Sequence, residues 1–170
     1  MPSGPFTHVA MVVKDLEKAT EDWTAILEVL DPAQLQDPIV KYDEFSSGED
    51  AGMRWVTFVN HHGAEIQLIE PSPGTPMGDR LEKVGEHVHH LCFTTPDVPG
   101  ALKKLEEKGV KLMSGGQVFN DPDMTWQRWG WVSHKSTHGC LIEVASPYQS
   151  KKDGKWHSAE TNDHSGAKAG

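Results

Sequence analysis

Four residues of metal-binding type occupy matched positions in two similar parts of the sequence. His8 is repeated at His90, 82 residues later, and Gln67 is matched by Glu143, each between a glycine four residues before and a proline four residues after. Two imidazoles, an amide oxygen and a carboxylate form a mixed nitrogen and oxygen ligand set. Such a set suits Co²⁺, Mn²⁺, Fe²⁺, Ni²⁺ or Zn²⁺ and leaves positions for water or a substrate. The sequence therefore predicts one divalent transition metal per chain, bound by His8, Gln67, His90 and Glu143.

Strand periodicity places the four side chains on one common face. Side chains alternate between the two faces of a strand, so each of these polar residues points away from its apolar neighbours. Burying an unpaired polar group costs roughly 2–7 kcal/mol, so a glutamine or glutamate within an apolar strand indicates a polar partner. By the same alternation, His89 lies on the face opposite His90. We expect it to serve in packing or in a hydrogen bond behind a metal ligand.

The elements that position these residues are predicted in the same order twice. In each half, β-branched residues predict a first strand, and an aspartate, Asp15 or Asp97, is placed to cap the helix that follows. The first half then contains a short strand and a hairpin, with the elements at residues 6–13, 16–30, 39–46, 54–60 and 64–70. The second half is similar, with its elements at residues 88–95, 97–108, 110–113, 126–133 and 140–145. Each half reads β-α-β-β-β, which predicts an α+β fold whose two repeats form a shared curved sheet with a central metal cavity.

We interpret residues 1–150 as a single domain with half-repeats over about 5–72 and 87–148. A segment rich in proline and glycine at 71–78 is expected to link the two halves. Beyond Ser150 the composition changes to lysine, serine, aspartate and glycine. This change predicts a disordered tail over residues 151–170.

Composition excludes several other classes of protein. The formal charge of −9 over 170 residues argues against nucleic acid as the main partner. No apolar run approaches the ~20 residues that cross a bilayer, and the first residues lack the features of a signal peptide, so we expect a cytoplasmic protein without membrane contact. Cys92 and Cys140 lie in apolar strand-like runs and are expected to be buried and reduced. Any metal is therefore expected to be held by nitrogen and oxygen ligands.

These motifs resemble the vicinal oxygen chelate superfamily, to which glyoxalase I and the extradiol dioxygenases belong. Within it, the chain is most similar to the methylmalonyl-CoA epimerases. The glutamine at the second ligand position favours that likeness over glyoxalase I, which typically has glutamate there. The resemblance implies the metal set His8, Gln67, His90 and Glu143. It is carried by the segments His8–Ala19, Glu65–Pro71, Leu81–Phe93, Leu102–Leu112 and His134–Val144.

The ligand set and the resemblance together predict a metal-dependent epimerase, isomerase or lyase that acts through an enolate of a chelated carbonyl substrate. A metal polarises the carbonyl oxygen, and a carboxylate then removes the acidified α-proton. We assign this role to Glu143, and the base on the opposite face to Glu44, where Asp43, Glu49 and Asp50 compete for the position. The substrate is expected to be a small carbonyl compound such as an acyl-CoA.

Two other functions stay open at this point. Two histidines and a carboxylate also suit a non-haem Fe(II) extradiol-type dioxygenase, and three tryptophans within residues 126–131 suit an aromatic substrate. Trp126 or Trp131 would then wall the cavity, or else belong to the core. The third class is a metal-independent small-molecule binding protein, although a binder has no need of an intact ligand set. A homodimer is compatible with all three.

Overall fold

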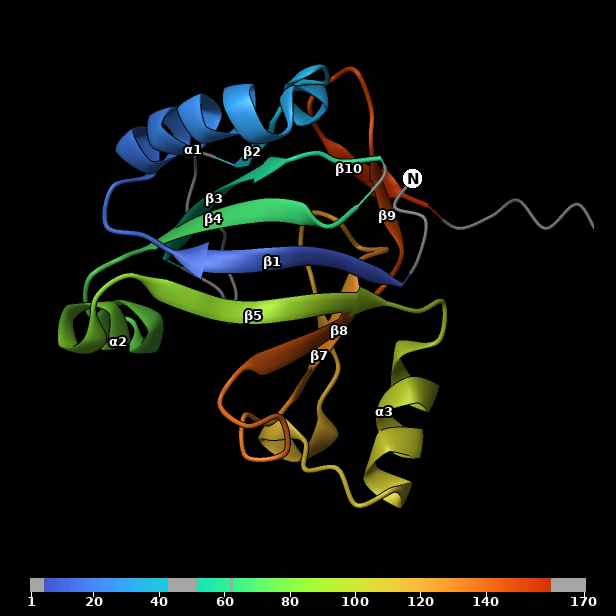
Figure 1. Ribbon diagram of the computed structural model, residues 1–170. Coiled ribbons are helices and arrows are strands. Elements are labelled where there is room, and N and C mark those ends of the chain that lie inside the picture. The colour runs from blue at the N-terminus through green and yellow to red at the C-terminus, as the bar shows by residue number, and fades with distance from the viewer. Residues whose placement is uncertain (1–4, 43–51, 62, 160–170) are drawn as a thin grey trace, which may run out of the picture.

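The computed structural model describes residues 5–42, 52–61 and 63–159. Its main feature is a curved eight-stranded mixed sheet with the strand order β2-β3-β4-β1-β5-β8-β7-β6 (Figure 1). The first half comprises β1 (Phe6–Val12), α1 (Leu16–Leu30), β2 (Val40–Tyr42), β3 (Met53–Phe58) and β4 (Glu65–Pro71). The second half comprises β5 (His87–Thr94), α3 (Val98–Glu107), β6 (Phe119–Asn120), β7 (Arg128–Val132) and β8 (Leu141–Ala145).

The predicted duplication is confirmed by the strand pairing. β1 and β5 lie antiparallel at the centre of the sheet, and each pairs in parallel with the last strand of its own half, β4 or β8. Each of those last strands forms an antiparallel pair with the strand before it, β3 or β7. The strands of the two β-α-β-β-β units thus form one continuous sheet in an α+β fold, as the repeated pattern predicts.

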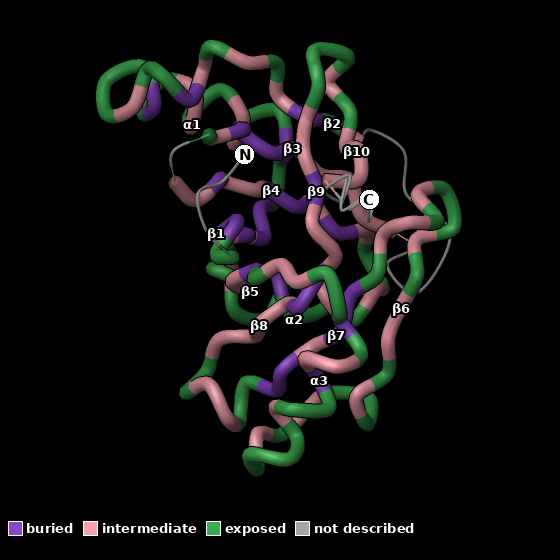
Figure 2. The backbone as a smooth tube through the Cα atoms, turned by 90° about the vertical axis from the view of Figure 1, so that its right-hand side faces the viewer, coloured by how far each residue is buried: buried purple, intermediate pink, exposed green. Residues whose placement is uncertain are grey.

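Each helix covers the sheet of its own half from outside. The Asp15 side chain accepts a hydrogen bond from the Lys18 amide at 2.8 Å and so starts α1 where predicted. Leu16 and Leu27 of this helix pack on the buried Phe58 and Leu68. A second cluster joins α3 to its half of the sheet through Val98, Leu102, Val132 and Val144. Figure 2 shows buried positions along the strands and exposed ones along the helices and outer loops.

Two segments differ from the prediction. The expected linker at 71–78 contains the start of helix α2 (Pro76–Val84), where the Thr75 hydroxyl accepts a hydrogen bond from the Gly78 amide and Pro76 occupies the first turn. Proline and glycine at these positions start a helix rather than prevent one. The expected strand at 110–113 is reduced to one bridge between Leu112 and Val132.

The predicted disordered tail also begins too early. The chain continues through a two-stranded antiparallel hairpin of β9 (Tyr148–Ser150) and β10 (Trp156–Ser158). Aromatic packing accounts for its order, because the rings of Tyr148 and Trp156 meet edge to face with centroids 4.4 Å apart. Residues 160–170 lie outside the described chain. Among the helices that are described, none has both the length and the apolar character needed to span a membrane.

Candidate metal centre

The register of the central strands brings the predicted ligands together. On β1, His8 pairs with Cys92, and Ala10 pairs with both His90 of β5 and Gln67 of β4. On the other side, Cys92 pairs with Glu143 of β8. The two small residues between the ligand strands, Ala10 and Cys92, are fully buried and leave room for the larger polar side chains around them.

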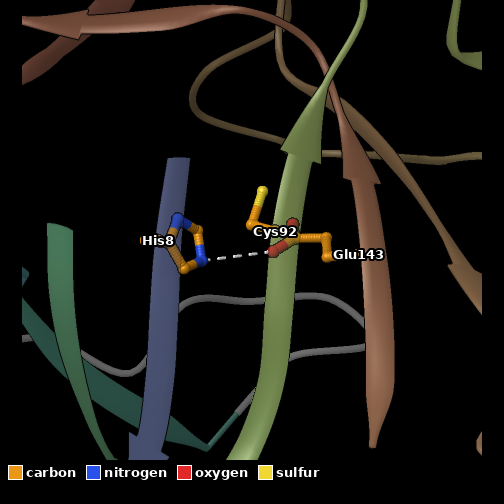
Figure 3. Close-up of side chains that lie close together, drawn as sticks. All are labelled: His8, Cys92 and Glu143. Atoms are coloured by element: carbon orange, nitrogen blue, oxygen red, sulfur yellow. Dashed lines mark ion pairs between the residues drawn. The ribbon is translucent and has the colours of Figure 1, made fainter. Parts of the chain in front are cut away.

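Three of the four predicted ligands converge closely. The Nε2 atoms of His8 and His90 lie 3.1 Å apart, and Glu143 Oε2 lies 3.0 Å from His90 Nε2 and 3.5 Å from His8 Nε2. Nitrogen and oxygen ligands about 2.0–2.2 Å from a common ion lie about 2.8–3.6 Å from each other at octahedral or tetrahedral angles. The three observed distances therefore fit a single ion. Figure 3 shows His8 and Glu143 pointing toward one another from β1 and β8.

The fourth predicted ligand, Gln67, lines the same cavity as His8, His90 and Glu143. Its amide nitrogen donates a hydrogen bond to the Thr57 hydroxyl at 3.4 Å. This leaves the amide oxygen as the atom that a metal would use, as the predicted ligand set requires.

The outer nitrogens of both histidines have partners of their own. His8 Nδ1 lies 2.7 Å from the Tyr148 hydroxyl, and His90 Nδ1 lies 2.8 Å from Nδ1 of His89. With hydrogen on Nδ1 in both rings, the two Nε2 lone pairs and the Glu143 carboxylate face each other without a proton between them. Three acceptors in such an arrangement are stabilised by a cation, so the donor set fits the predicted metal.

The electrostatics of the cluster favour a neutral His8 and an ionised Glu143. Burial lowers the pKa of His8, although Glu143 opposes this effect, so the imidazole is neutral near pH 7. Burial alone would raise the pKa of Glu143, but the imidazoles of His8 and His90, when a facing Nε2 carries hydrogen, outweigh it and hold that pKa well below its usual range. A neutral imidazole and an ionised carboxylate are the forms that bind metal ions.

The Cys92 thiol also belongs to this cluster, although the sequence predicts nitrogen and oxygen ligands only. Possible ligand atoms of His8, Cys92 and Glu143 all lie within 4.8 Å of one another, which makes a candidate His/Cys/Glu site (Figure 3). Cys92 is free and fully buried, and burial raises its thiol pKa well above the usual value. The neutral thiol is a weak ligand, so the nitrogen and oxygen set remains the preferred assignment.

Strict alternation would place His89 and His90 on opposite faces of the sheet. In the structure both rings lie on the cavity side. The pairing with β1 shifts between Ala10–His90 and Met11–Val88, so His89 is an extra residue in the ladder, as in a β-bulge. Its ring lines the cavity beside His90. Burial, with the charge of His90 as the second influence, lowers the pKa of His89 to about 3. The expected hydrogen bond behind a ligand is therefore present, but on the cavity side.

Two further polar residues of the site, Glu65 and Tyr148, were missed from the sequence. The Tyr148 hydroxyl donates a hydrogen bond to Glu65 Oε2 at 3.1 Å and also contacts His8. Burial raises the pKa of Glu65 to about 8 and that of Tyr148 well above its usual value. The signal for Glu65 was available, because it lies two residues before Gln67 on the same strand and therefore on the same face.

Six tryptophan and tyrosine side chains line the cavity. Trp126 and Trp131, for which the sequence allows either a core or a cavity position, both line the cavity. Further wall residues come from β3, from β7 and from the C-terminal hairpin, namely Trp55, Trp129, Tyr148 and Trp156. The predicted second base, Glu44, and its competitors Asp43, Glu49 and Asp50 lie outside the described residues.

Comparison with known proteins agrees with this architecture. The family model described as "Glyoxalase/Bleomycin resistance protein/Dioxygenase superfamily" matches residues 7–126. The ethylmalonyl-CoA/methylmalonyl-CoA epimerase of Cereibacter sphaeroides is 26% identical over 147 residues, covering 83% of this chain and 96% of that protein. The mitochondrial methylmalonyl-CoA epimerase of Bos taurus is 29% identical over 115 residues, covering 65% of this chain and 58% of that protein.

Solved structures show the same fold. A methylmalonyl-CoA epimerase variant of Streptomyces coelicolor in complex with 2-nitronate-propionyl-CoA superimposes with a TM-score of 0.64 at 23% identity, covering 84% of this chain and 96% of that chain. The methylmalonyl-CoA epimerase of Mycobacterium tuberculosis also has a TM-score of 0.64, at 22% identity, covering 86% and 92%. These matches confirm the fold and the resemblance that the sequence motifs predict, and the relatives are enzymes by name.

Proposed function

Because the chain belongs to the glyoxalase/bleomycin resistance protein/dioxygenase superfamily, we propose that it is a metal-dependent epimerase-type isomerase that moves the α-proton of an acyl thioester or a similar carbonyl compound. The observation that carries this proposal is the convergence of His8 Nε2, His90 Nε2 and Glu143 Oε2 within 3.0–3.5 Å of each other. The names of the relatives, which are epimerases of acyl-CoA substrates, support the choice of reaction.

In this proposal His8, Gln67, His90 and Glu143 hold one divalent metal. The ion, when bound, supplies Lewis-acid polarisation of a substrate carbonyl oxygen and thereby acidifies the neighbouring C–H. With four protein ligands, about two positions of an octahedral ion stay open to a substrate. The histidines and the glutamine carry no net charge, so Glu143 is the single anion of the ligand set.

Glu143 is also the proposed base on one face of the substrate. Its side chain retains 14% of its exposure and lines the cavity, so one carboxylate oxygen can accept a proton while the other stays with the histidines. Glu44 is the proposed acid on the opposite face. In the sequence it lies between β2 and β3, and Gly52, the first described residue after it, leads into β3, which carries Trp55 of the cavity wall. Return of the proton from that side inverts the carbon.

The tryptophan side chains in the cavity wall exclude water from the site. Trp131 packs edge-on against both His89 and His90, with centroids 6.1 Å and 5.1 Å away. An apolar wall beside the polar cluster strengthens the electrostatic interactions inside and protects a carbanion-like intermediate of the substrate from bulk solvent. The walls also favour a substrate with a large apolar or planar substituent.

The test is solvent exchange without oxygen. Purified protein loaded with Zn²⁺ or Co²⁺ is incubated anaerobically in D₂O with a panel of α-branched acyl-CoA thioesters and followed by mass spectrometry and NMR. The proposal expects deuterium at the α-carbon and loss of optical purity. Glu143→Gln should slow exchange far more than it weakens metal binding, because an amide coordinates but does not accept the proton. Activity that requires Fe²⁺ and consumes O₂ in step with product would favour the dioxygenase alternative instead.

A further inference from the structure

The two matched histidines have different partners behind them. His90 Nδ1 lies 2.8 Å from Nδ1 of His89, its neighbour on the same strand. His8 Nδ1 lies 2.7 Å from the hydroxyl of Tyr148, which begins β9 in the C-terminal hairpin. The hairpin follows the last strand of the second repeat, so the support for His8 comes from outside the duplicated fold.

Tyr148 connects His8 to a buried carboxylate. Its hydroxyl donates to Glu65 Oε2 at 3.1 Å, and Glu65 is only 2% exposed. No lysine or arginine of the described chain forms an ion pair with Glu65. Burying a carboxyl group is costly even in its neutral form, so the presence of Glu65 at this position calls for a physical reason.

Comparison with the second half of the molecule shows that the fold itself does not require a carboxyl group at position 65. Glu65 pairs with His8 in the β1–β4 ladder, and Leu141 pairs with His90 in the β5–β8 ladder. Leu141 lies two residues before Glu143, just as Glu65 lies two residues before Gln67. An apolar side chain thus occupies the matching position of the same sheet. The carboxylate is an addition that strand geometry does not demand.

We propose that Tyr148 and Glu65 are positioning residues that hold His8 for metal coordination, an inference that rests on the metal-dependent function proposed above. With Nε2 given to a metal, His8 carries its hydrogen on Nδ1 and donates it to the Tyr148 oxygen. The Tyr148 hydroxyl then donates to Glu65. This chain of hydrogen bonds fixes the tautomer and the rotation of the imidazole and makes Nε2 a stronger donor. The Glu65 carboxyl oxygen gives the Tyr148 hydroxyl a fixed acceptor, which explains why this polar group is buried at this position.

The same residue joins the metal centre to the cavity wall. The Tyr148 ring contacts Trp156 edge to face, and Trp156 stacks with Trp55 at a centroid distance of 6.4 Å. All three rings line the cavity that contains His8. The C-terminal hairpin is therefore part of the site, and its loss should affect the metal as well as the wall.

The test measures metal binding and not turnover. Co²⁺ affinity is determined by competition with a chromophoric chelator, and the visible spectrum of the cobalt protein is recorded for the wild type, Tyr148→Phe, Glu65→Leu and Glu65→Gln. Tyr148→Phe and Glu65→Leu should weaken binding by about 10–100-fold and alter the spectrum. Glu65→Gln should lose less, since the amide oxygen still accepts the Tyr148 hydrogen. Tyr42→Phe is the matched control, because it removes a hydroxyl that contacts the Met124 sulfur, at 3.2 Å, and the Trp156 backbone, and that forms no hydrogen bond with His8 or Glu65.

The outcomes separate this inference from the proposed function. Wild-type affinity and spectrum in Tyr148→Phe would overturn the positioning role and leave the metal site intact. Equal losses in Tyr42→Phe and Tyr148→Phe would also overturn it, because they would trace the effect to the aromatic wall. Absence of metal binding by the wild type would overturn the proposed function and this inference with it. If Tyr148→Phe does not fold, the comparison of Glu65→Leu with Glu65→Gln decides the question.

Discussion

The ring of Trp131 stands edge-on to that of His90, with centroids 5.1 Å apart and an angle of 80° between the ring planes. The tryptophan thus holds one candidate metal ligand from the side while it forms part of the cavity wall. In the second half of the fold, β7 therefore contributes to the site although it carries none of the four ligands.

Replacing Trp131 by alanine should loosen His90 and weaken metal binding. An edge-to-face aromatic pair contributes about 0.5–1.5 kcal/mol, which corresponds to a few-fold to about tenfold in affinity. Chelator competition measures the change directly. Trp131→Phe, which keeps an aromatic edge at this position, is the control and should retain most of the affinity. Full affinity in Trp131→Ala would show that His90 is held by its strand and by His89 alone.

Alanine substitutions at His89 and His90 should both weaken metal binding, but to different extents. His90→Ala removes a candidate ligand and should abolish measurable metal binding. His89→Ala removes the partner of His90 Nδ1, and loss of such a partner typically costs about 10–100-fold in affinity. Strict strand alternation would instead predict no effect of His89→Ala on the metal. Metal titration of both variants, with circular dichroism to verify folding, distinguishes the two views, and wild-type affinity in His89→Ala would contradict the bulged geometry.

Cys92 should prove dispensable for the metal despite its place in the cluster. The high pKa that burial imposes on its thiol disfavours the thiolate that coordination needs. Cys92→Ser is expected to bind Co²⁺ within a few-fold of the wild type. The cobalt spectrum of the wild type should lack a thiolate-to-cobalt charge-transfer band. A strong band of this kind, lost in Cys92→Ser, would place sulfur among the ligands and revise the nitrogen and oxygen set.

The positions of the candidate ligands could be predicted because the fold repeats itself. The match of His8 with His90, and of Gln67 with Glu143, needed only the sequence and the period of a strand. The side of the sheet on which His89 lies was not predictable in this way. It depends on a register shift between β1 and β5, and this shift is decided by pairing between distant strands.

The contribution of the C-terminal hairpin to the site could not be predicted from the composition of that segment. Residues 151–155 are rich in lysine, aspartate and glycine, and this favoured a disordered tail. Trp156 and Tyr148 outweigh that bias, because each buries an aromatic ring against the other and against the cavity wall. The contact of Tyr148 with Glu65 spans 83 residues and follows from no local pattern.

The start of helix α2, which lies in the segment expected to be a linker, can be tested by substitution. Gly78 is buried in the first turn of α2, and a Cβ atom added there would lie 2.3 Å from the Ser72 carbonyl oxygen. This neighbour is backbone and cannot turn aside, so Gly78→Ala should displace the start of the helix and lower the free energy of unfolding by about 1–3 kcal/mol. Urea denaturation of the metal-free protein measures the effect. Gly63→Ala is the matched control, since its added Cβ would make only an ordinary contact of 3.5 Å with the Asn60 side chain. Equal stability of the two variants would mean that Ser72 and Gly78 lie farther apart than in this structure.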